Sequence, residues 1–171
     1  MSNITVGVDI SKAKFDAAIL FSNNKVKTKK FENKRSGFSG LIEWLKKYKA
    51  LKAHVCLEAT GIYSEGLATY LFEAGLKVSV VNPVRIKGFA QSELTRTKTD
   101  KADSQLIARF CQAINPVFWQ PKPQHIQELQ AFVRRLENLQ NLWQQETNRL
   151  EAAPSCVQSS IKTIVKHLKK E

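Results

Sequence analysis

The chain has 171 residues, with 27 Lys and Arg against 15 Asp and Glu, so its formal net charge at pH 7 is +12. Hydrophobic residues make up 43% and charged residues 25%, values typical of a folded globular protein that exclude a disordered chain. No apolar run reaches the length of a membrane span, and the N-terminus lacks the basic and apolar regions of a signal peptide. We therefore expect a protein with no membrane partner that is made and kept in the cytoplasm.

The basic excess is concentrated in the first 124 residues. Residues 125–171 hold seven Lys and Arg and five acids, which leaves a balance of +10 for the rest of the chain. A strongly basic domain favours a polyanionic partner, and nothing here resembles an amphipathic membrane helix, so nucleic acid is the partner we expect. The odd number and wide spacing of Cys56, Cys111 and Cys156 argue against a disulfide framework and against a zinc site.

The first third of the chain predicts an antiparallel meander. Residues 4–10 alternate apolar and small or polar side chains, and this strand ends at an acid, Asp9. Residues 14–21 and 25–32, separated by two asparagines, predict two further strands. The third of these strands is so rich in lysine that we expect it to be exposed or at the edge of the sheet.

Helices and strands then alternate. Residues 36–49 have helical spacing, and 53–58 form a short apolar strand that again ends at an acid, Glu58. A helix follows Thr60-Gly61 and closes at Gly75. A strand over 77–81 is stopped by a proline, and a basic segment leads to a last helix near residue 100. This order predicts a mixed sheet over residues 1–115 with helices on its faces.

A proline-containing linker over residues 116–124 precedes a predicted helical segment over 125–171. Apolar residues follow a three–four alternation from Ile126 to Leu150, which indicates an amphipathic helix with coiled-coil tendency. Pro154 ends this helix, and a second amphipathic helix follows. Such a pair cannot bury its apolar stripe alone, so we expect it to pack on the domain, on itself or on a second chain, and we expect a homo-oligomer.

Two acids, Asp100 and Asp103, lie three residues apart at the start of the helix near residue 100. Their side chains would be neighbours on the helix surface and could share divalent cations. A local alternative stays open, in which Asp100 caps the helix and Asp103 is an acid favoured by the helix dipole.

Two strand-terminal acids, Asp9 and Glu58, favour the metal-binding interpretation, although Asp100 can still cap its helix. In this strand order the ribonuclease H-like arrangement places the first and fourth strands side by side, so that Asp9 and Glu58 would face the helix carrying Asp100 and Asp103. Four carboxylates suffice to hold two divalent cations for in-line displacement at a phosphodiester. Nearby cations would hold the nucleic-acid strand by its phosphates. The candidates for this role are Arg85, Lys87, Arg96, Lys98 and Lys101.

Four sequence blocks around these acids resemble the DEDD-type insertion-sequence transposases, the relatives of the Piv invertase (insertion-sequence family one-ten, the bridge-RNA-guided recombinases). The blocks are GVDISKAKFD at 7–16, LEATGIYSEGL at 57–67, VNP at 81–83 and RTKTDKADSQLIA at 96–108. The resemblance assigns the four family acids to Asp9, Glu58, Asp100 and Asp103. It implies a RuvC-like nuclease domain that binds Mg²⁺, with Mn²⁺ as a substitute, together with DNA and a structured guide RNA.

The resemblance also implies a second domain with a catalytic serine beyond the coiled-coil helices. The late serines Ser155, Ser159 and Ser160 lie in the predicted helical segment and do not match that motif. We therefore expect the metal-dependent half of a transposase or recombinase, which does not perform full strand exchange by itself.

Two other functions stay open on sequence. The first is a non-catalytic module that binds RNA or DNA and dimerises through residues 125–170. The second is a phosphotransferase related to the actin-like ATPases, because residues 7–16 also resemble a phosphate-binding hairpin. The sequence offers this second reading no further phosphate loop and no glycine-rich adenosine motif.

Overall fold

The computed structural model describes residues 4–92 and 100–171, apart from the side chains of Asp100 and Lys101. The chain divides into two compact units, Met1–Pro121 and Lys122–Glu171, and each is described by itself. The finer domain boundaries expected from the sequence, at 115 and 125, stay a prediction.

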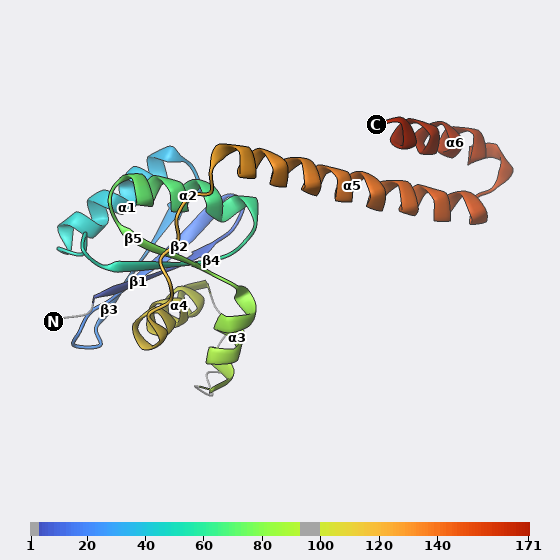
Figure 1. Cartoon of the computed structure of the whole chain (residues 1–171). Helices are drawn as coiled ribbons and strands as arrows, with labels where there is room; N and C mark the ends of the chain where they lie inside the picture. Colours follow the sequence, from blue (N-terminus) through green and yellow to red (C-terminus); the bar gives the residue numbers. More distant parts are fainter. Residues whose placement is uncertain (1–3, 93–99) are drawn as a thin grey trace. The chain divides into compact units, whose positions relative to one another are not determined.

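The first unit is built on a five-stranded mixed sheet with the order β3-β2-β1-β4-β5 (Figure 1). β1 pairs antiparallel with β2, and β2 with β3, whereas β1, β4 and β5 run parallel. This topology confirms the predicted ribonuclease H-like arrangement, with the first and fourth strands adjacent and the lysine-rich third strand at an edge. The strands are β1 (Thr5–Ile10), β2 (Lys14–Leu20), β3 (Val26–Glu32), β4 (His54–Glu58) and β5 (Lys77–Val81).

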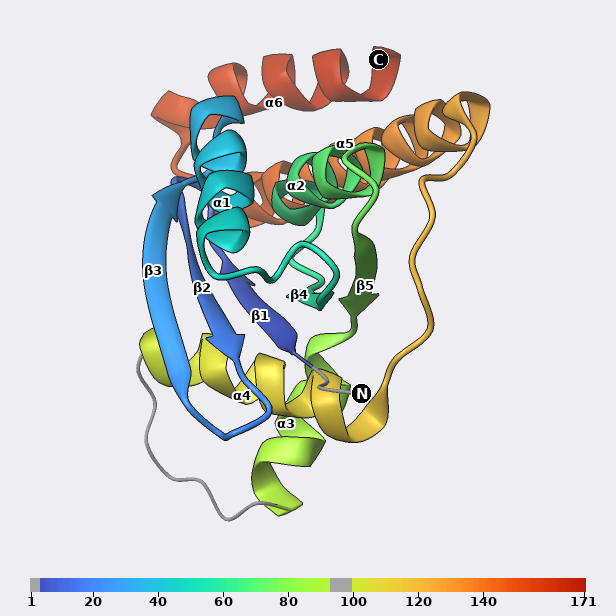
Figure 2. The same ribbon diagram turned by 90° about the vertical axis from the view of Figure 1, so that its left-hand side faces the viewer.

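Helices cover both faces of the sheet (Figures 1 and 2). α1 (Arg35–Lys47) and α2 (Ile62–Glu73) lie on one face, and α3 (Pro83–Ser92) and α4 (Asp100–Ile114) lie on the other. Side chains alternate along β1, so Val6 and Val8 are fully buried in the main core with α1 and α2. The intervening residues of β1 therefore face α4.

α4 packs directly on the backbone of β1 at Gly7. A Cβ at Gly7 would lie 2.2 Å from both the amide nitrogen of Ala108 and the carbonyl oxygen of Ser104, so only glycine allows this approach. Two residues earlier in β1, the Thr5 hydroxyl donates a hydrogen bond of 2.9 Å to the Ala108 carbonyl. These contacts fix α4 against the strand that carries Asp9.

One predicted feature was wrong. The segment after β5 was expected to be a basic connection, but it forms the helix α3. The Asn82 side chain accepts a hydrogen bond of 2.8 Å from the Val84 amide, so it caps the helix. Proline at the first helical position is favourable, because its missing N–H is not needed there. Asn82-Pro83 thus starts a helix as well as ending a strand.

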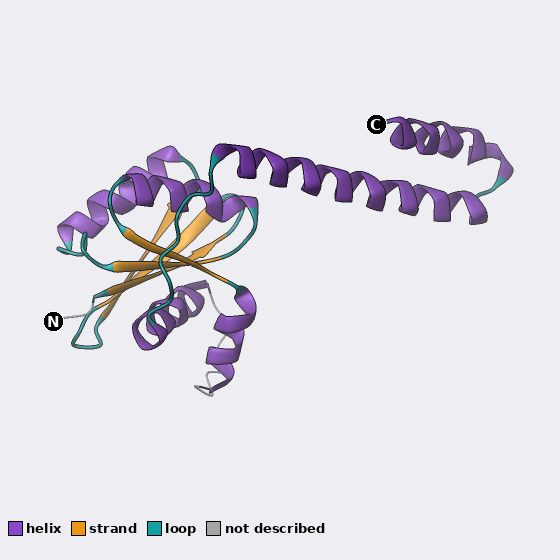
Figure 3. Ribbon diagram, viewed as in Figure 1, coloured by secondary structure: helices purple, strands orange, loops and turns teal. Residues whose placement is uncertain are grey.

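The second unit is a pair of helices, α5 (Gln124–Ala152) and α6 (Ser155–Lys170), joined at Ala153 and Pro154 (Figure 3). The predicted helical character and the break at Pro154 are confirmed. Both helices are fully described, and neither contains a fully buried residue. Across the described residues, no helix combines the length and the apolar character needed to cross a membrane.

Candidate carboxylate site at the ends of the parallel strands

Two of the predicted acids lie on neighbouring strands. Val8 of β1 is in register with Leu57 of β4, so Asp9 and Glu58 follow side by side at the carboxyl ends of the two strands. Both side chains are half-buried. The edge where parallel strands end is the usual position of a functional crevice in such sheets.

Asp103, in the first turns of α4, lies within electrostatic range of Glu58. Burial raises the pKa of the Glu58 carboxyl, the negative charge of Asp103 raises it further, and the nearby Lys87 ammonium opposes both effects. A third acid therefore approaches the strand ends from α4, as the sequence predicted, because α4 is held tightly on β1.

The full four-acid set stays a prediction. The described side chains form no group of three or more His, Cys, Asp or Glu close enough together to hold a metal ion. The side chain of Asp100 is not among those described, although its backbone is the first residue of α4.

The predicted phosphate-binding residues divide into three groups. Lys87 is exposed on α3 and close enough to Glu58 to influence its pKa. The Arg85 guanidinium lies 5.8 Å from the centroid of the Phe110 ring, a cation–π contact that joins α3 to α4. Arg96, Lys98 and the side chain of Lys101 lie outside the described part of the chain.

Asp16 is a further buried acid at this edge, outside the four acids predicted from the sequence. It stands directly opposite Asp9 in the antiparallel register of β1 and β2, only 5% exposed. The Lys30 ammonium of β3 lies 3.7 Å from its carboxylate. The predicted hairpin was a usable signal, since the pairing of residues 4–10 with 14–21 brings the two aspartates together.

The turn after Glu58 contributes a second unassigned group. Among the described residues, the buried Thr60 hydroxyl has no hydrogen-bond partner. The next residue, Gly61, has φ +64°, a backbone conformation that favours glycine and starts α2. A buried hydroxyl without a partner costs stability, and this one lies two residues from Glu58 in the chain.

Asn33 ties together the turns that follow the two acid-bearing strands. Its side-chain amide donates hydrogen bonds of 3.0 Å to the Ser11 carbonyl, after β1, and 3.2 Å to the Tyr63 carbonyl, at the start of α2. Its backbone amide donates a further bond of 2.9 Å to the Ala13 carbonyl. Asn33 therefore links the turn after β1 to the start of α2, in addition to the direct pairing of β1 with β4.

This donor set suits a hard divalent cation. The groups gathered at the edge are carboxylate and hydroxyl oxygens, which Mg²⁺ and Mn²⁺ prefer over the sulfur and imidazole ligands of zinc sites. Glu58 and Asp103 repel each other when both are ionised, and a cation between them would remove that repulsion.

Fold and site together define a ribonuclease H-like α/β domain with acids at the carboxyl ends of its parallel strands. The model of the DEDD transposase family of insertion-sequence type one-ten, described as "Transposase", matches residues 6–153. The chain therefore belongs to this family, which confirms the resemblance carried by its four sequence blocks.

Two curated relatives are similar over nearly all of this chain. The pilin gene-inverting proteins of Moraxella bovis and Moraxella lacunata are each 36% identical to it over 169 residues, which is 98% of this chain and 52% of each relative. The chain thus spans about half the length of the curated relatives it matches.

Among solved structures, RuvC of Thermus thermophilus in complex with a Holliday junction substrate has a TM-score of 0.48 and 12% sequence identity. The similarity covers 66% of this chain and 96% of that one. A second Thermus thermophilus RuvC structure has a TM-score of 0.46 at 13% identity, with the same coverage.

Proposed function

We propose that this chain supplies the metal-dependent half of a DNA recombinase active site, which cleaves and exchanges DNA strands under the guidance of a structured RNA. The observation that carries the proposal is the approach of Asp103, on α4, to Glu58, beside the strand that carries Asp9. Asp9 and Glu58 lie on neighbouring strands, and the charges of Asp103 and Lys87 both act on Glu58.

In this proposal Asp9, Glu58 and Asp103, with Asp100, hold Mg²⁺ or Mn²⁺. When bound, such ions activate an attacking oxygen and stabilise the leaving oxygen at a phosphodiester. Asn33 ties the turn after Asp9 to the start of α2, which follows Glu58, through its bonds to the Ser11 and Tyr63 carbonyls. Carboxylates that repel one another destabilise the fold without the ion, a cost that is typical of a functional site.

Phosphate contacts come from the basic residues around the acids. Lys87 is the best supported, since its charge acts on Glu58 from the exposed surface of α3. In the proposal Arg85, Arg96, Lys98 and Lys101 also contact phosphates. Such contacts hold a strand in position without reading its sequence.

The partners follow from the family and from the charge. DNA as substrate is supported by family membership and by the relatives described as gene-inverting proteins. The structured guide RNA rests on the resemblance of the sequence blocks. We further propose a composite active site, in which a serine-bearing domain of the kind the resemblance implies supplies the nucleophile.

Self-association through the second unit completes the proposal. Exposed apolar side chains run along both helices, and the buried Trp143 indole N–H has no hydrogen-bond partner among the described residues. A second copy packed on this face would bury the apolar residues at little cost, because both helices are already formed. These residues are Leu129, Phe132, Val133, Leu136, Leu142, Val157 and Ile164.

Thermal unfolding tests the metal site. Millimolar Mg²⁺ or Mn²⁺ is expected to raise the Tm by about 2–5 °C, as for a ligand at roughly ten times its Kd. Asp9→Asn and Asp103→Asn each abolish this rise, whereas Glu73→Gln, at an exposed position of α2, retains it. A native chain whose Tm does not respond to either metal would contradict the proposal.

A non-catalytic binding module is the second candidate, and the exposed lysines of the edge strand β3 and the turn before it favour it. Lys25, Lys27, Lys29 and Lys30 are all exposed. A module of this kind binds RNA or DNA with a steep salt dependence and without any need for the acids. A variant with Asn or Gln at all four acid positions should then bind RNA as tightly as the native chain. If this variant is folded but no longer binds RNA, the non-catalytic binding module is excluded.

A further inference from the structure

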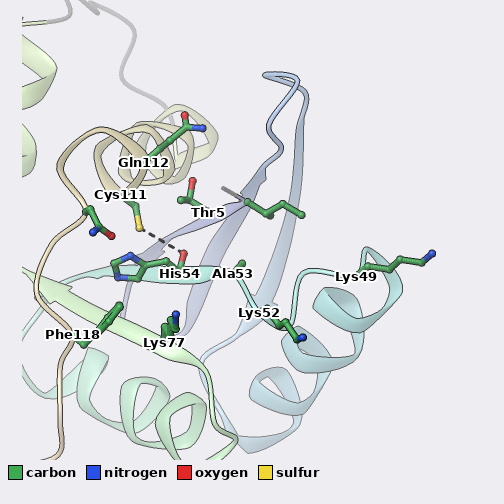
Figure 4. Close-up of a pocket in the computed structure, with 11 residues that line it drawn as sticks. Thr5, Lys49, Lys52, Ala53, His54, Lys77, Cys111, Gln112 and Phe118 are labelled. Carbon is green, nitrogen blue, oxygen red and sulfur yellow. Dashed lines mark hydrogen bonds between the residues drawn. The ribbon is translucent and has the colours of Figure 1, made fainter. Parts of the chain in front are cut away.

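A pocket of about 570 Å³ opens at the opposite edge of the sheet from the acids (Figure 4). It lies where the three parallel strands begin, since Thr5, His54 and Lys77 are in register with one another. The end of α4 and the segment that follows it form another wall, through Cys111, Gln112, Asn115 and Phe118. A cavity of this size is in the range of small-ligand pockets.

The pocket is basic. None of the eleven described residues that line it is acidic, and three of them are lysines, Lys49, Lys52 and Lys77. In Figure 4 the side chain of Lys77 lies beside Phe118, whereas that of Lys49 extends away from the other labelled residues. Lys52 and Lys77 are both exposed, so their ammonium groups are available to an anion at the mouth.

His54 forms a neutral, well-anchored part of the wall. Its Nε2 lies 2.7 Å from the Ser79 hydroxyl, which also lies 2.7 Å from the Val117 carbonyl. The hydroxyl has a single proton to donate to that carbonyl, so it accepts from Nε2–H. Burial lowers the pKa of His54, and Lys77 lowers it further against the effect of an Asn115 hydrogen bond. The ring is therefore uncharged at neutral pH.

Phe118 presents an aromatic surface at this pocket. Its side chain is 50% exposed, although it belongs to the compact first unit. The ring meets His54 edge-on at a centroid distance of 5.0 Å, and the Lys77 ammonium lies 5.7 Å from its centroid. An exposed phenyl ring beside Lys77, in a pocket that Lys52 also lines, combines a stacking surface with phosphate-binding charge, as in proteins that hold single-stranded nucleic acid.

We propose that this pocket binds one unstacked nucleotide of a single-stranded nucleic acid, with the base on Phe118 and the flanking phosphates on Lys52 and Lys77. A base inside a duplex is stacked on its neighbours and cannot reach the ring, so the pocket selects single strands. The shared chemistry is that of DNA and RNA strands alike. The site lies four residues along β1 from Asp9, about 13 Å at the rise of a β-strand, and it needs no metal.

Fluorescence anisotropy with the full chain, in the absence of divalent metal, tests the proposal. The probes are labelled thymidine and uridine oligonucleotides of about 12 nucleotides and a duplex of the same length. Phe118→Ala is expected to weaken single-strand binding about fivefold or more, while duplex binding is unchanged. The double variant Lys52→Gln with Lys77→Gln should bind single strands with a weaker salt dependence. The slope of log binding constant against log salt concentration should fall in magnitude by about 1.4, the value for two lost phosphate contacts. The two single-stranded probes distinguish DNA from RNA as the bound strand.

Matched controls separate stacking from general effects. Val117→Ala, next to Phe118 and 89% exposed, removes apolar surface outside the pocket and should bind normally. Lys46→Gln with Lys47→Gln, exposed at the end of α1, should leave the slope nearly unchanged. Phe118→Trp should restore binding and Phe118→Leu should not, which excludes a packing defect. Native binding by Phe118→Ala, or equal losses for single strand and duplex, would overturn the proposal.

Discussion

The three parallel strands carry opposite charge at their two ends, which we call the carboxyl edge and the amino edge of the sheet. At the carboxyl edge, Asp9 and Glu58 end their strands and Asp103 approaches from α4, so like charges are held together. At the amino edge, lysines surround a neutral histidine whose Nε2 is hydrogen-bonded. The first edge stores electrostatic repulsion that a cation would relieve, whereas the second offers positive charge to an anion.

α4 couples the two edges because it spans the sheet between them. Its first turns carry Asp103, and its last turns line the lysine pocket with Cys111 and Gln112. The Cys111 thiol lies 3.6 Å from the His54 carbonyl, which anchors this end of the helix on β4. A displacement of α4 should therefore disturb both edges, while a change at one edge should leave the other intact.

The largest effect is expected from Gly7→Ala, which breaks both edges together. The added Cβ would overlap the α4 backbone at Ser104 and Ala108, so α4 must move away from β1. Overpacking of this kind lowers the unfolding free energy by about 1–3 kcal/mol. We expect a loss of about 3 kcal/mol here, because the atoms that the Cβ meets belong to the backbone and cannot rotate away. Denaturant unfolding measures the loss, and the Mg²⁺-dependent rise in Tm should disappear with it.

Gly88→Ala is the matched control for that substitution. A Cβ at Gly88 meets no atom within 4 Å, and the residue lies inside α3. Alanine there should leave the protein equally stable or stabilise it by about 0.5–1 kcal/mol, because it favours the helix. Equal losses for the two alanine variants would show that the close approach of α4 is not what Gly7 provides.

A smaller effect, confined to the carboxyl edge, is expected from Asn33→Ala. The substitution removes the bonds to the Ser11 and Tyr63 carbonyls, at a cost of about 1 kcal/mol. The metal-binding free energy, measured by titration calorimetry, should fall by more than the unfolding free energy, since the turns after Asp9 and Glu58 lose their common link. Ser39→Ala removes one exposed hydrogen bond within α1, to the Ser36 carbonyl, and should change neither stability nor metal affinity measurably. If Asn33→Ala lowered metal affinity no more than Ser39→Ala does, Asn33 would not position the site.

The contrast between the edges also shows what the sequence could predict. Alternation in residues 4–10 and the two acid-terminated strands predicted the mixed sheet and the neighbouring positions of Asp9 and Glu58, because period-two patterns and crossover rules are local and strong. The sequence does not predict α3, because Asn82-Pro83 is also typical of the end of a strand. The same two residues can also cap and start a helix, so the local sequence is compatible with either a strand end alone or a strand end followed by a helix.

The amino edge could not be predicted, because it is assembled from distant residues with ordinary local roles. Lys52 follows a helix, His54 and Lys77 begin strands, and Phe118 lies in a linker that holds prolines. Only the register of three strands and the return of the chain after α4 bring them together. The position of Asp16 opposite Asp9, by contrast, follows from the predicted pairing of residues 4–10 with 14–21.

Glu58→Gln should sharpen the contrast by stabilising the carboxyl edge. Because the pKa of Glu58 is raised in the folded state, its ionisation costs stability once the pH exceeds the ordinary value of about 4.3, and the cost is complete above the raised pKa. The substitution should raise the metal-free Tm at pH 7 by about 1–3 °C and abolish the response to Mg²⁺. Glu65→Gln, exposed on α2, is the control, and a lower Tm for Glu58→Gln would mean that its charge is favourable.

The smallest effect is expected at His54, where the pH dependence has the opposite sign. Burial lowers the pKa of His54 in the folded state, so the unfolded chain binds the proton first and stability falls as the pH drops below about 6.5. His54→Gln keeps a donor for Ser79 and should reduce the loss in Tm between pH 7.5 and 5.5 by about 1–2 °C. His167→Gln, exposed on α6, should not change that loss. Acid thus relieves the carboxyl edge and strains the amino edge, and a single pH series on Glu58→Gln and His54→Gln separates the two contributions.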